Sequence, residues 1–559
     1  MKNLISAFAF AVIAAAVPVR LGAQEPAALP ENVIKVTMPE NVTPSAYSEP
    51  IKVEGLSYNF APVFLIYPDR KVNQEGAAEL VAELGIADVE KMVVTAVYVV
   101  NPISEKYDAA ADFEVFKTMF SRHAADGNTK VVGIGEGATF VNRVIAPQAE
   151  FCLAGVLSIG GKAWKMPKKG GPYAGVPAYI AGDGASKVAD AYIRMAGAQK
   201  KDDAYYNAAE PLLKVDFDDA PTSDLSAVFS EAWESVLRKC YRFNNVGHTG
   251  YEGAAFGQYG TYELEPYVSW EDLGMTRLVR NMAPNALRPD DLYLWYEYWP
   301  DELMKDAPAG SIPVMVLFHG NRNDPRAQAE TSGFLQVAGE ERFVIIEMEW
   351  QGSHKFLAMQ HDGIEALLDR LCREYPQLDP TRIYASGLSA GSMTAAALGI
   401  TKTHVFAAVG GNNGGTWSDA LMAQAIQKSG ALMPYCSIAG TADYVVGVVT
   451  PQTYQKNGIS RSWKLYQAIN GLPVWENLDF DTDPVFGMCL ADRETLHFNK
   501  GDGIDVETGA LYKDGIPVIK LVAVVNYGHF NFQPCARLAW DYYKRFSRNR
   551  RTGELIYNK

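Results

Sequence analysis

The chain is poor in cysteine and histidine, and it carries fewer positive than negative charges. Among its 559 residues, 51 lysines and arginines stand against 65 aspartates and glutamates, which gives a formal net charge of −14. A nucleic acid or an anionic membrane would be repelled by this charge, so neither is expected as a partner, whereas a neutral polymer or a small ester is compatible with it. No metal-ligand spacing is found among the six cysteines, which are Cys152, Cys240, Cys372, Cys436, Cys489 and Cys535.

Long apolar runs are absent beyond the N-terminus, which begins MKNLISAFAFAVIAAAVPVRLGAQEP. Lys2, an apolar run from Leu4 to Val17 and two small residues after it predict a secretory signal peptide over residues 1–23. A membrane anchor needs about 20 apolar residues, and a proline and an arginine interrupt this run. We therefore expect a secreted or periplasmic protein, in a compartment where disulfides are permitted.

Strand-like apolar runs alternate with helical patterns along the whole chain, which predicts an α/β protein whose mostly parallel sheets are flanked by helices. The chain is also longer than one hydrophobic core usually serves, so two domains are expected.

Four blocks of the first half recur in the same order in the second half, each at a strand or an adjacent turn. They pair PVFLIYPDR with PVMVLFHGNR, TKVVGIGEGATF with TRIYASGLSAGSMT, VPAYIAGDGA with MPYCSIAGTAD, and PLLKVDF…CYRF with PVIKLVAV…YKRF. We interpret this as a duplicated domain. The first copy is placed at residues 51–245, after a linker and first-strand region at 24–50, and the second at residues 246–559.

The stretch GLSAG, residues 387–391, follows an apolar strand-like run and precedes a run of small residues. The G-x-S-x-G pattern is typical of a nucleophile elbow, in which the serine occupies a strained turn between a strand and a helix. Neighbouring side chains would clash with that turn, which explains the flanking glycines. Ser389 is therefore the predicted nucleophile.

A serine hydroxyl needs a histidine to take its proton and a carboxylate to orient that histidine. In α/β-hydrolases these partners follow the serine in the order acid, histidine, each after a later strand. Asp443 follows the strand-like run YCSIAG and His529 follows LVAVVNYG, so they are the predicted acid and base. Other candidates after the serine are Asp479, Asp481 and Asp483 for the acid, and His404 and His497 for the base.

The tetrahedral intermediate of acyl transfer needs N–H donors aimed at its oxyanion. The backbone N–H of Ala390, directly after the nucleophile, is predicted to be one donor. The second is expected from the loop FHGNR, residues 318–322, with Asn321 or Gly320 as the donor. His319 is predicted to be structural rather than a general base.

Residues from about 290 to 550 resemble the secreted esterase family of polyhydroxybutyrate depolymerases, feruloyl esterases and acetylxylan esterases. The resemblance is carried by HGNRND, LDPTRIYASGLSAGSMT, AGTADYVV and NYGHFNF. It implies an α/β-hydrolase that cleaves carboxylic esters through an acyl-enzyme, without a metal or an organic cofactor. Ser389 would be the nucleophile, His529 the base and then the acid, and Asp443 the residue that orients the histidine. The residues after HG and the long separation between Asp443 and His529 depart from the family pattern, and the extra residues would wall the substrate pocket.

The stretch VVGIGEGATF, residues 131–140, fits the G-x-G-x-x-G/A pattern of a dinucleotide-binding turn. An ungapped alignment of Thr129 on Thr381 instead sets GEGAT on GLSAG and places Gly137 at the nucleophile position. In the same comparison Ala185 replaces the acid, DDAPTS (218–223) replaces NYGH, and YPDR lacks the HG pair. The first copy is therefore predicted to be a degenerate hydrolase domain with a structural role, and not an NAD site.

The sequence thus predicts two tandem α/β-hydrolase-like domains, the second of which is a secreted serine esterase. Feruloyl or acetyl esters of plant polysaccharide are expected first and a polyester (polyhydroxyalkanoate) second, with a peptidase as a third alternative. A non-catalytic, ligand-binding pseudo-hydrolase is the alternative of another class. Six aromatic residues would either stack on sugars or phenolic groups or, as we favour, pack in cores and interdomain contacts; they are Tyr262, Tyr267, Trp270, Trp295, Tyr296 and Trp299.

Overall fold

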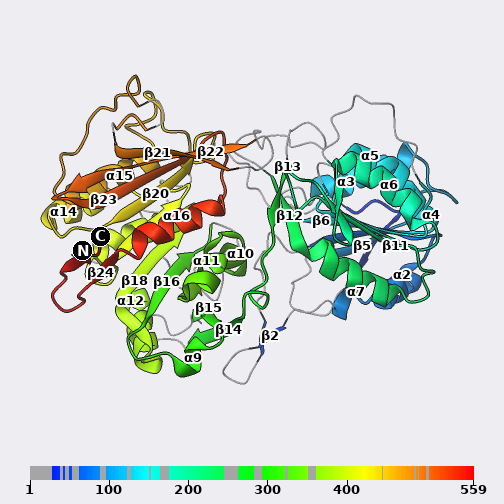
Figure 1. The fold of residues 1–559 in the computed structure, drawn as a ribbon, viewed down its shortest axis with the longest axis horizontal. Coiled ribbons are helices and arrows are strands. Elements are labelled where there is room, and N and C mark those ends of the chain that lie inside the picture. The colour runs from blue at the N-terminus through cyan, green and yellow to red at the C-terminus, as the bar shows by residue number, and fades with distance from the viewer. Residues whose placement is uncertain are drawn as a thin grey trace.

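The computed structural model describes residues 28–37, 42–44, 50–52, 62–88, 96–122, 128–149, 153–163, 175–244, 262–282, 293–320, 325–349, 361–443, 445–483, 486–488, 490–498 and 503–559. Within these residues, two large sheets lie toward opposite ends of the longest dimension of the molecule (Figure 1). We call the part of the chain built on the first sheet unit 1, and the part built on the second sheet unit 2.

The sheet of unit 1 has nine strands in the described residues: the six in the middle are parallel, and the outer strands β1, β10 and β9 each pair antiparallel with their neighbours. In spatial order they are β1 (Val33–Val36), β5 (Ala96–Val100), β4 (Val63–Tyr67), β6 (Thr129–Ile134), β7 (Gly155–Ile159), β8 (Ala178–Ala181), β11 (Lys214–Asp218), β10 (Ala204–Tyr206) and β9 (Gln199–Lys201).

The sheet of unit 2 has ten strands in the described residues, again with six parallel strands in the middle. In spatial order they are β14 (Met275–Met282), β15 (Tyr293–Pro300), β17 (Val344–Met348), β16 (Ile312–Phe318), β18 (Leu378–Gly387), β19 (Ala408–Asn412), β20 (Tyr435–Gly440), β23 (Ile516–Val524), β22 (Ile504–Lys513) and β21 (Ala491–Phe498).

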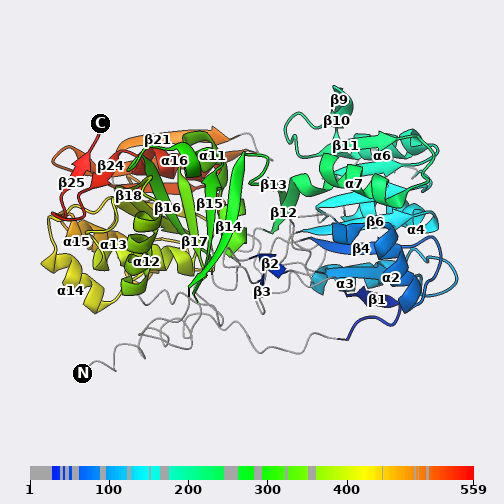
Figure 2. The ribbon, with the colours of Figure 1, turned by 90° about the horizontal axis from the view of Figure 1, so that it is seen from below.

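The two sheets share one strand order. Without β14, the sheet of unit 2 repeats the order and the directions of the sheet of unit 1, so that β1 corresponds to β15, β4 to β16, β6 to β18, β8 to β20 and β11 to β23. Helices flank both sheets (Figure 2). The predicted α/β class, with mostly parallel sheets flanked by helices, is confirmed.

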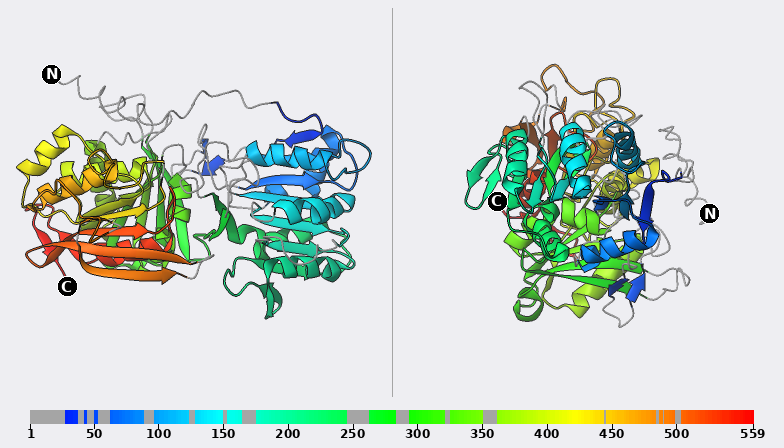
Figure 3. Two further views of the ribbon diagram at one scale, coloured as in Figure 1. Left: turned by 90° about the horizontal axis from the view of Figure 1, so that it is seen from above. Right: turned by 90° about the vertical axis from the view of Figure 1, so that its right-hand side faces the viewer.

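Each sheet buries both of its faces. Successive side chains of a strand point to opposite sides, and helices cover both sides. In β4, Leu65 packs with one face and Phe64 with the other; in β16, Leu317 and Val316 do the same. In unit 1, α3 (Ala111–Arg122) and α6 (Ala185–Ala196) cover one face, and α2 (Gln74–Glu83) and α7 (Leu225–Ser235) cover the other. In unit 2, α11 (Phe334–Glu341) and α16 (Pro534–Tyr543) cover one face, and α12 (His361–Glu374), α13 (Ala390–Thr401) and α15 (Gly458–Ile469) cover the other (Figure 2). The left view of Figure 3 shows yellow-to-orange helices of this second face from the opposite side.

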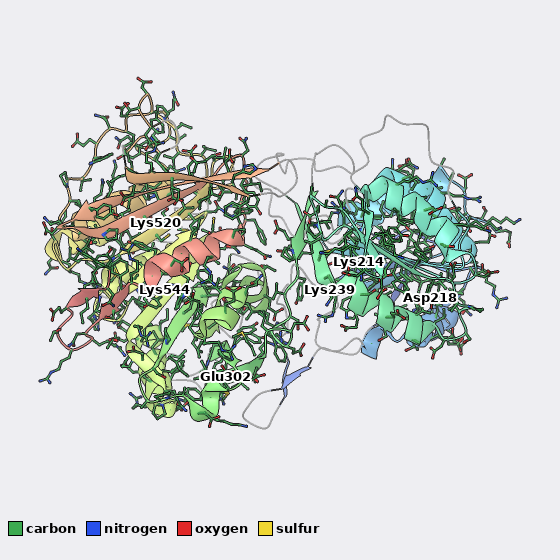
Figure 4. The ribbon with its side chains drawn as sticks, in the orientation of Figure 1. Lys214, Asp218, Lys239, Glu302, Lys520 and Lys544 are labelled. Carbon is green, nitrogen blue, oxygen red and sulfur yellow. The ribbon has the colours of Figure 1, made fainter. Side chains whose placement is uncertain are left out.

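A two-stranded antiparallel ribbon lies between the units, formed by β12 (Cys240–Asn244) and β13 (Tyr262–Pro266) (Figures 1 and 2). Lys239, just before β12, lies on the side of unit 1 that faces unit 2, whereas Asp218 lies farther from unit 2 (Figure 4). The remaining elements are short or peripheral: β2 (Val42–Pro44), β3 (Pro50–Lys52), β24 (Phe546–Arg548), β25 (Leu555–Tyr557), α4 (Glu136–Phe140), α5 (Ala146–Ala149), α9 (Leu303–Asp306), α10 (Pro325–Thr331), α14 (Asp419–Gln427), η1 (Ile86–Asp88), the π-helical η2 (Val141–Ile145) and η3 (Leu237–Lys239).

Some sequence-based expectations fall on residues outside the described part of the chain. The signal peptide over residues 1–23 is one of them, and the predicted boundary between residues 245 and 246 is another. No helix in the described part is long and apolar enough to cross a membrane. Cys240, Cys372, Cys436 and Cys535 are free thiols, while the other two cysteines lie outside the described residues.

Candidate active site

Ser389 lies at a sharp turn between β18 and α13, at the carboxyl end of a central strand. Its φ of 54° and ψ of −117° are rare for a residue with a side chain, and such conformations cost about 1–3 kcal/mol. Backbone hydrogen bonds hold the turn: the Ser389 N–H donates to Asn412 O at 2.9 Å, and the Met393 N–H donates to Ser389 O at 3.0 Å. The predicted nucleophile therefore occupies a strained strand-to-helix turn.

Three glycines allow the backbone to approach this turn closely. A Cβ on Gly391 would lie 2.0 Å from Phe318 O, and one on Gly387 would lie 2.5 Å from the same oxygen. A Cβ on Gly414, which follows β19, would lie 2.3 Å from Ser389 O. Side chains cannot be accommodated at such distances, so the packing requires glycine on both sides of the serine.

Asp443 and His529 form a hydrogen bond after the neighbouring strands β20 and β23. Asp443 Oδ2 lies 2.8 Å from His529 Nδ1, and Asp443 is fully buried. The carboxylate accepts hydrogen bonds only, so it places the proton of a neutral imidazole on Nδ1 and leaves Nε2 as the acceptor. This tautomer is the one that a general base for Ser389 needs.

The loops that carry the acid and the base are tied to each other by backbone and side-chain contacts. The Ala442 N–H donates to Tyr527 O at 3.0 Å, and the Asn526 N–H donates to Thr441 Oγ1 at 2.8 Å. The second oxygen of Asp443, Oδ1, accepts from the Val445 N–H at 3.0 Å. Asp443 is thus held on one side by its own loop and on the other by His529.

Asn413, which the sequence did not single out, connects the end of β19 to the segments that carry Asp443 and His529. It directly follows β19, is almost fully buried and has a positive φ of 48°. Its Nδ2 donates to Phe530 O, next to His529, at 2.5 Å, and its Oδ1 accepts from the Gly440 N–H at 2.7 Å. The only sequence signal for this role is the position of GGNNGG at the end of a buried strand, since asparagine tolerates positive φ.

The predicted oxyanion residues fall partly outside the described chain. Ala390 is the first residue of α13, and Gly320 is buried after β16, whereas Asn321 lies outside the described residues. His319 is fully buried; its Nδ1 donates to Gly320 O at 2.8 Å, and its Nε2 lies 3.3 Å from Glu349 Oε1. These contacts agree with a structural role for His319. They also hold the carbonyl of Gly320, at the start of the loop that follows β16.

The alternative acids and bases have other partners. The Asp479 carboxylate accepts from the Thr482 hydroxyl in an exposed turn, and Asp483 lies 3.4 Å from Arg493. His497, on β21 of the antiparallel pair β21 and β22, lies 2.8 Å from Asp505, and His404 pairs with Glu365. In the described part of the chain, no three His, Cys, Asp or Glu side chains gather in a way that would hold a metal ion.

The aromatic residues that the sequence singled out mostly pack inside the protein. Trp295, Tyr296 and Trp299 on β15 are buried, and the indole N–H groups of both tryptophans donate to the Glu297 carboxylate at 2.9 Å. Tyr267 and Trp270 are partly buried against the core of unit 2. The side chain of Tyr262 lies outside the described residues. The packing interpretation is therefore the right one for the three residues of β15.

Unit 1 contains a turn with the same geometry as the Ser389 turn, but its register differs from the one predicted. Gly135, between β6 and α4, has a φ of 56° and a ψ of −116°. Gly137 matches Gly391 instead, because a Cβ there would lie 2.1 Å from Tyr67 O. The residue at the nucleophile position is therefore Gly135 and not Gly137. The ungapped alignment was wrong by two residues because it matched glycine letters rather than the strand end.

A carboxylate occupies the space above this turn in unit 1. A Cβ added to Gly135 would lie 1.9 Å from Asp69 Oδ1, and the same oxygen accepts from the Glu136 N–H at 2.8 Å. Glu136 follows Gly135 as Ala390 follows Ser389. In unit 1, the N–H that corresponds to a predicted oxyanion donor is thus bound by a side chain of the protein itself.

Comparisons with protein-family models and with curated proteins give no match. Solved structures that resemble the chain include an acetyl xylan esterase from Aspergillus awamori (11% identity, TM-score 0.32, 48% of this chain and 98% of that one). Others are an S-formylglutathione hydrolase from Agrobacterium tumefaciens (13%, 0.32, 48% and 95%) and a feruloyl esterase module from Clostridium thermocellum (10%, 0.32, 48% and 87%). These structures are esterases and related hydrolases, and each is similar to about half of this chain.

Proposed function

We propose that unit 2 is a serine ester hydrolase that works through an acyl-enzyme. The observation that carries the proposal is the 2.8 Å contact between Asp443 Oδ2 and His529 Nδ1, at the same sheet edge as the strained turn of Ser389. In a parallel sheet the carboxyl ends of neighbouring strands lie at one edge, and Ser389, Asp443 and His529 follow three strands that end at this edge, β18, β20 and β23.

Each residue would have a defined part in the reaction. Ser389 Oγ attacks the ester carbonyl while His529 Nε2 takes its proton, and Asp443 stabilises the imidazolium that forms. The Ala390 N–H receives the oxyanion of the tetrahedral intermediate. His529 then returns the proton to the leaving alcohol, and a water molecule releases the acyl group by the reverse sequence of proton transfers.

Hydrolysis of p-nitrophenyl acetate by the wild type and by Ser389→Ala, at equal concentrations of folded protein, tests this proposal. We expect turnover by the wild type alone, together with covalent labelling of Ser389 by a fluorophosphonate. Equal activity of both proteins would place the nucleophile elsewhere. Inactivity of both, with undiminished ligand binding by Ser389→Ala, would favour the non-catalytic alternative.

For the substrate, we propose a feruloyl or acetyl ester on plant polysaccharide, which is supported by the motifs HGNRND and LDPTRIYASGLSAGSMT. A panel of feruloylated, acetylated, hydroxybutyrate and peptide substrates separates the alternatives by kcat/KM. Hydroxybutyrate release without feruloyl turnover would identify a polyester depolymerase, and amide turnover would identify a peptidase.

We also propose that unit 1 is a degenerate copy of the same fold and that the chain is exported. The matching strand order, Gly135 at the nucleophile position and Asp69 above it support the first proposal. The N-terminal sequence supports the second, and N-terminal sequencing of the exported protein should begin at Gln24.

A further inference from the structure

The ribbon of β12 and β13 contributes one face to each unit. Tyr241 pairs with Glu265, and Arg242 pairs with Leu264 in the antiparallel register, so each pair shares a face and the two pairs point to opposite sides. Leu264 belongs to the core of unit 1, whereas Tyr241 belongs to the core of unit 2. The ribbon is therefore a shared structural element and not a linker on the surface.

Its face toward unit 1 is fixed by hydrogen bonds to backbone carbonyls. The buried guanidinium of Arg242 donates to Leu153 O at 2.7 Å and to Gly175 O at 2.8 Å. The buried ammonium of Lys130, on β6, donates to Cys240 O at 3.1 Å. Charge-assisted hydrogen bonds in a buried setting leave the ribbon little freedom to move relative to unit 1.

Its face toward unit 2 reaches the segment that carries the candidate base. Glu265, which is 1% exposed, accepts at Oε1 from the Tyr527 hydroxyl at 3.3 Å. Pro266 O accepts from Gln533 Nε2 at 3.0 Å. Tyr527 and Gln533 stand on either side of His529 in the chain, so the ribbon holds this segment at both ends.

Tyr527 also connects the ribbon to the acid. Its carbonyl accepts from the Ala442 N–H, next to Asp443, while its hydroxyl lies 3.3 Å from Glu265 Oε1 and 3.4 Å from Asn531 O. A shift of the Tyr527 ring would therefore move the backbone on both sides of the hydrogen bond between Asp443 and His529.

We propose that Glu265 is a positioning residue for His529, and that unit 1 acts on catalysis through the ribbon by way of Glu265 and Tyr527. This inference rests on the proposed esterase function of unit 2. It gives the degenerate unit a definite role, which is to supply the fixed support against which the histidine segment is held.

The test uses the full chain with Glu265→Gln, Tyr527→Phe and the double variant. The matched control is Tyr542→Phe, since Tyr542 is also buried in unit 2 and its hydroxyl donates to Pro517 O at 2.8 Å. For p-nitrophenyl acetate, we expect each Glu265 or Tyr527 variant to lower kcat about 10-fold with KM nearly unchanged, because small misplacements of a catalytic group reduce rate strongly. The double variant should lose no more than the worse single variant, since both changes break one contact.

The pH profile separates positioning from general destabilisation. The Glu265 and Tyr527 substitutions alter the support of the contact between His529 and Asp443, so the shape of the pH profile of kcat/KM should change in these variants but not in Tyr542→Phe. The inference would be overturned if the Glu265 and Tyr527 variants kept the kcat of the wild type. It would also be overturned if the fold-loss of kcat in the double variant equalled the product of the two single losses. Either result would leave the esterase proposal intact. An inactive wild type would instead overturn the esterase proposal, and this inference with it.

Discussion

Gly135 and Ser389 adopt nearly the same backbone conformation, with φ/ψ of 56°/−116° and 54°/−117°. In each case the N–H donates to the carbonyl of the last residue of the next strand, Ile159 at 2.8 Å and Asn412 at 2.9 Å. The two turns differ in their side chains, because Asp69 fills the space in unit 1 that the serine side chain would occupy. The geometry of the turn is thus present in both units, but only the turn of unit 2 carries a serine.

Replacing Gly135 with serine should destabilise the protein rather than create a second nucleophile. We expect the free energy of unfolding to fall by about 1–3 kcal/mol because of the positive φ, and to fall further because of the clash with Asp69. Adding Asp69→Ala should recover the loss that comes from the clash, as measured by urea unfolding. Gly160→Ser is the control, since Gly160 also has a positive φ but has open space around it; Asp69→Ala should not rescue that variant. Equal rescue of both serine variants would contradict the role given to Asp69.

Asp443→Asn should lower kcat for ester hydrolysis by about 10⁴-fold with little change in KM, because an amide does not hold the histidine in the required tautomer. Stopped-flow or steady-state assays with p-nitrophenyl acetate measure this loss. The same substitution at Asp481, an exposed alternative acid, should leave kcat unchanged. A large loss of kcat in Asp481→Asn and a small one in Asp443→Asn would show that Asp443 is not the acid.

Asn413→Ala and Asn413→Gly should both lower kcat, by about 10-fold, since both remove the contacts to Phe530 O and Gly440 N. The glycine variant should be the more stable of the two by about 1 kcal/mol, because glycine adopts positive φ without strain. Asn470→Ala is the control: Asn470 is buried and bridges the backbone of Met433 in unit 2, so its loss should lower the melting temperature without this effect on kcat. Similar kcat values in Asn413→Ala, Asn413→Gly and Asn470→Ala would show that Asn413 has no specific role in the site.

Lys130→Met should stabilise the protein near pH 7. Burial lowers the pKa of the Lys130 ammonium from 10.5 to about 8, so the folded state binds fewer protons than the unfolded state between these values. Lys130 is therefore least unfavourable to the free energy of unfolding above pH 10.5, and this stability is lost as the pH falls to about 8. The difference of about 2.5 pKa units corresponds to roughly 3 kcal/mol, from which the lost hydrogen bond to Cys240 O must be subtracted.

Urea unfolding at several pH values between 7 and 10.5 measures this effect. The advantage of Lys130→Met should shrink as the pH rises, whereas the exposed control Lys162→Met should show no such trend. An advantage that is independent of pH would mean that Lys130 is not desolvated in the native protein.

The sequence was sufficient to place the strands and the residues at their ends. Apolar runs such as PVMVLFHG and TRIYASG became β16 and β18, and the residues that follow β18, β20 and β23 lie where parallel topology requires them. Asp443 was preferred because it directly follows a strand, and that position is what brings it to His529. The strand predictions succeeded because they depend on local pattern and on one rule of connectivity, whereas the catalytic roles of these residues stay predictions.

The contacts that were missed depend on tertiary structure. Asn413 has no neighbour in the sequence that reveals its bonds to Phe530 and Gly440, which are 117 and 27 residues away. Glu265 appears in the sequence as one acidic residue among many, and only the fold shows that it is buried against Tyr527. The register of Gly135 was missed because three glycines in five residues give the alignment no side chain to anchor it.

The shared ribbon also determines what the loss of unit 1 would do to unit 2. A truncated protein that begins at residue 246 would keep β13 but lose its partner strand, exposing Leu264 and an unpaired strand edge of the kind that promotes aggregation. Deleting unit 1 would thus damage the unit that contains Ser389. Unit 1 would then be retained because β12 belongs to the framework that unit 2 needs, whatever chemistry unit 1 itself performs.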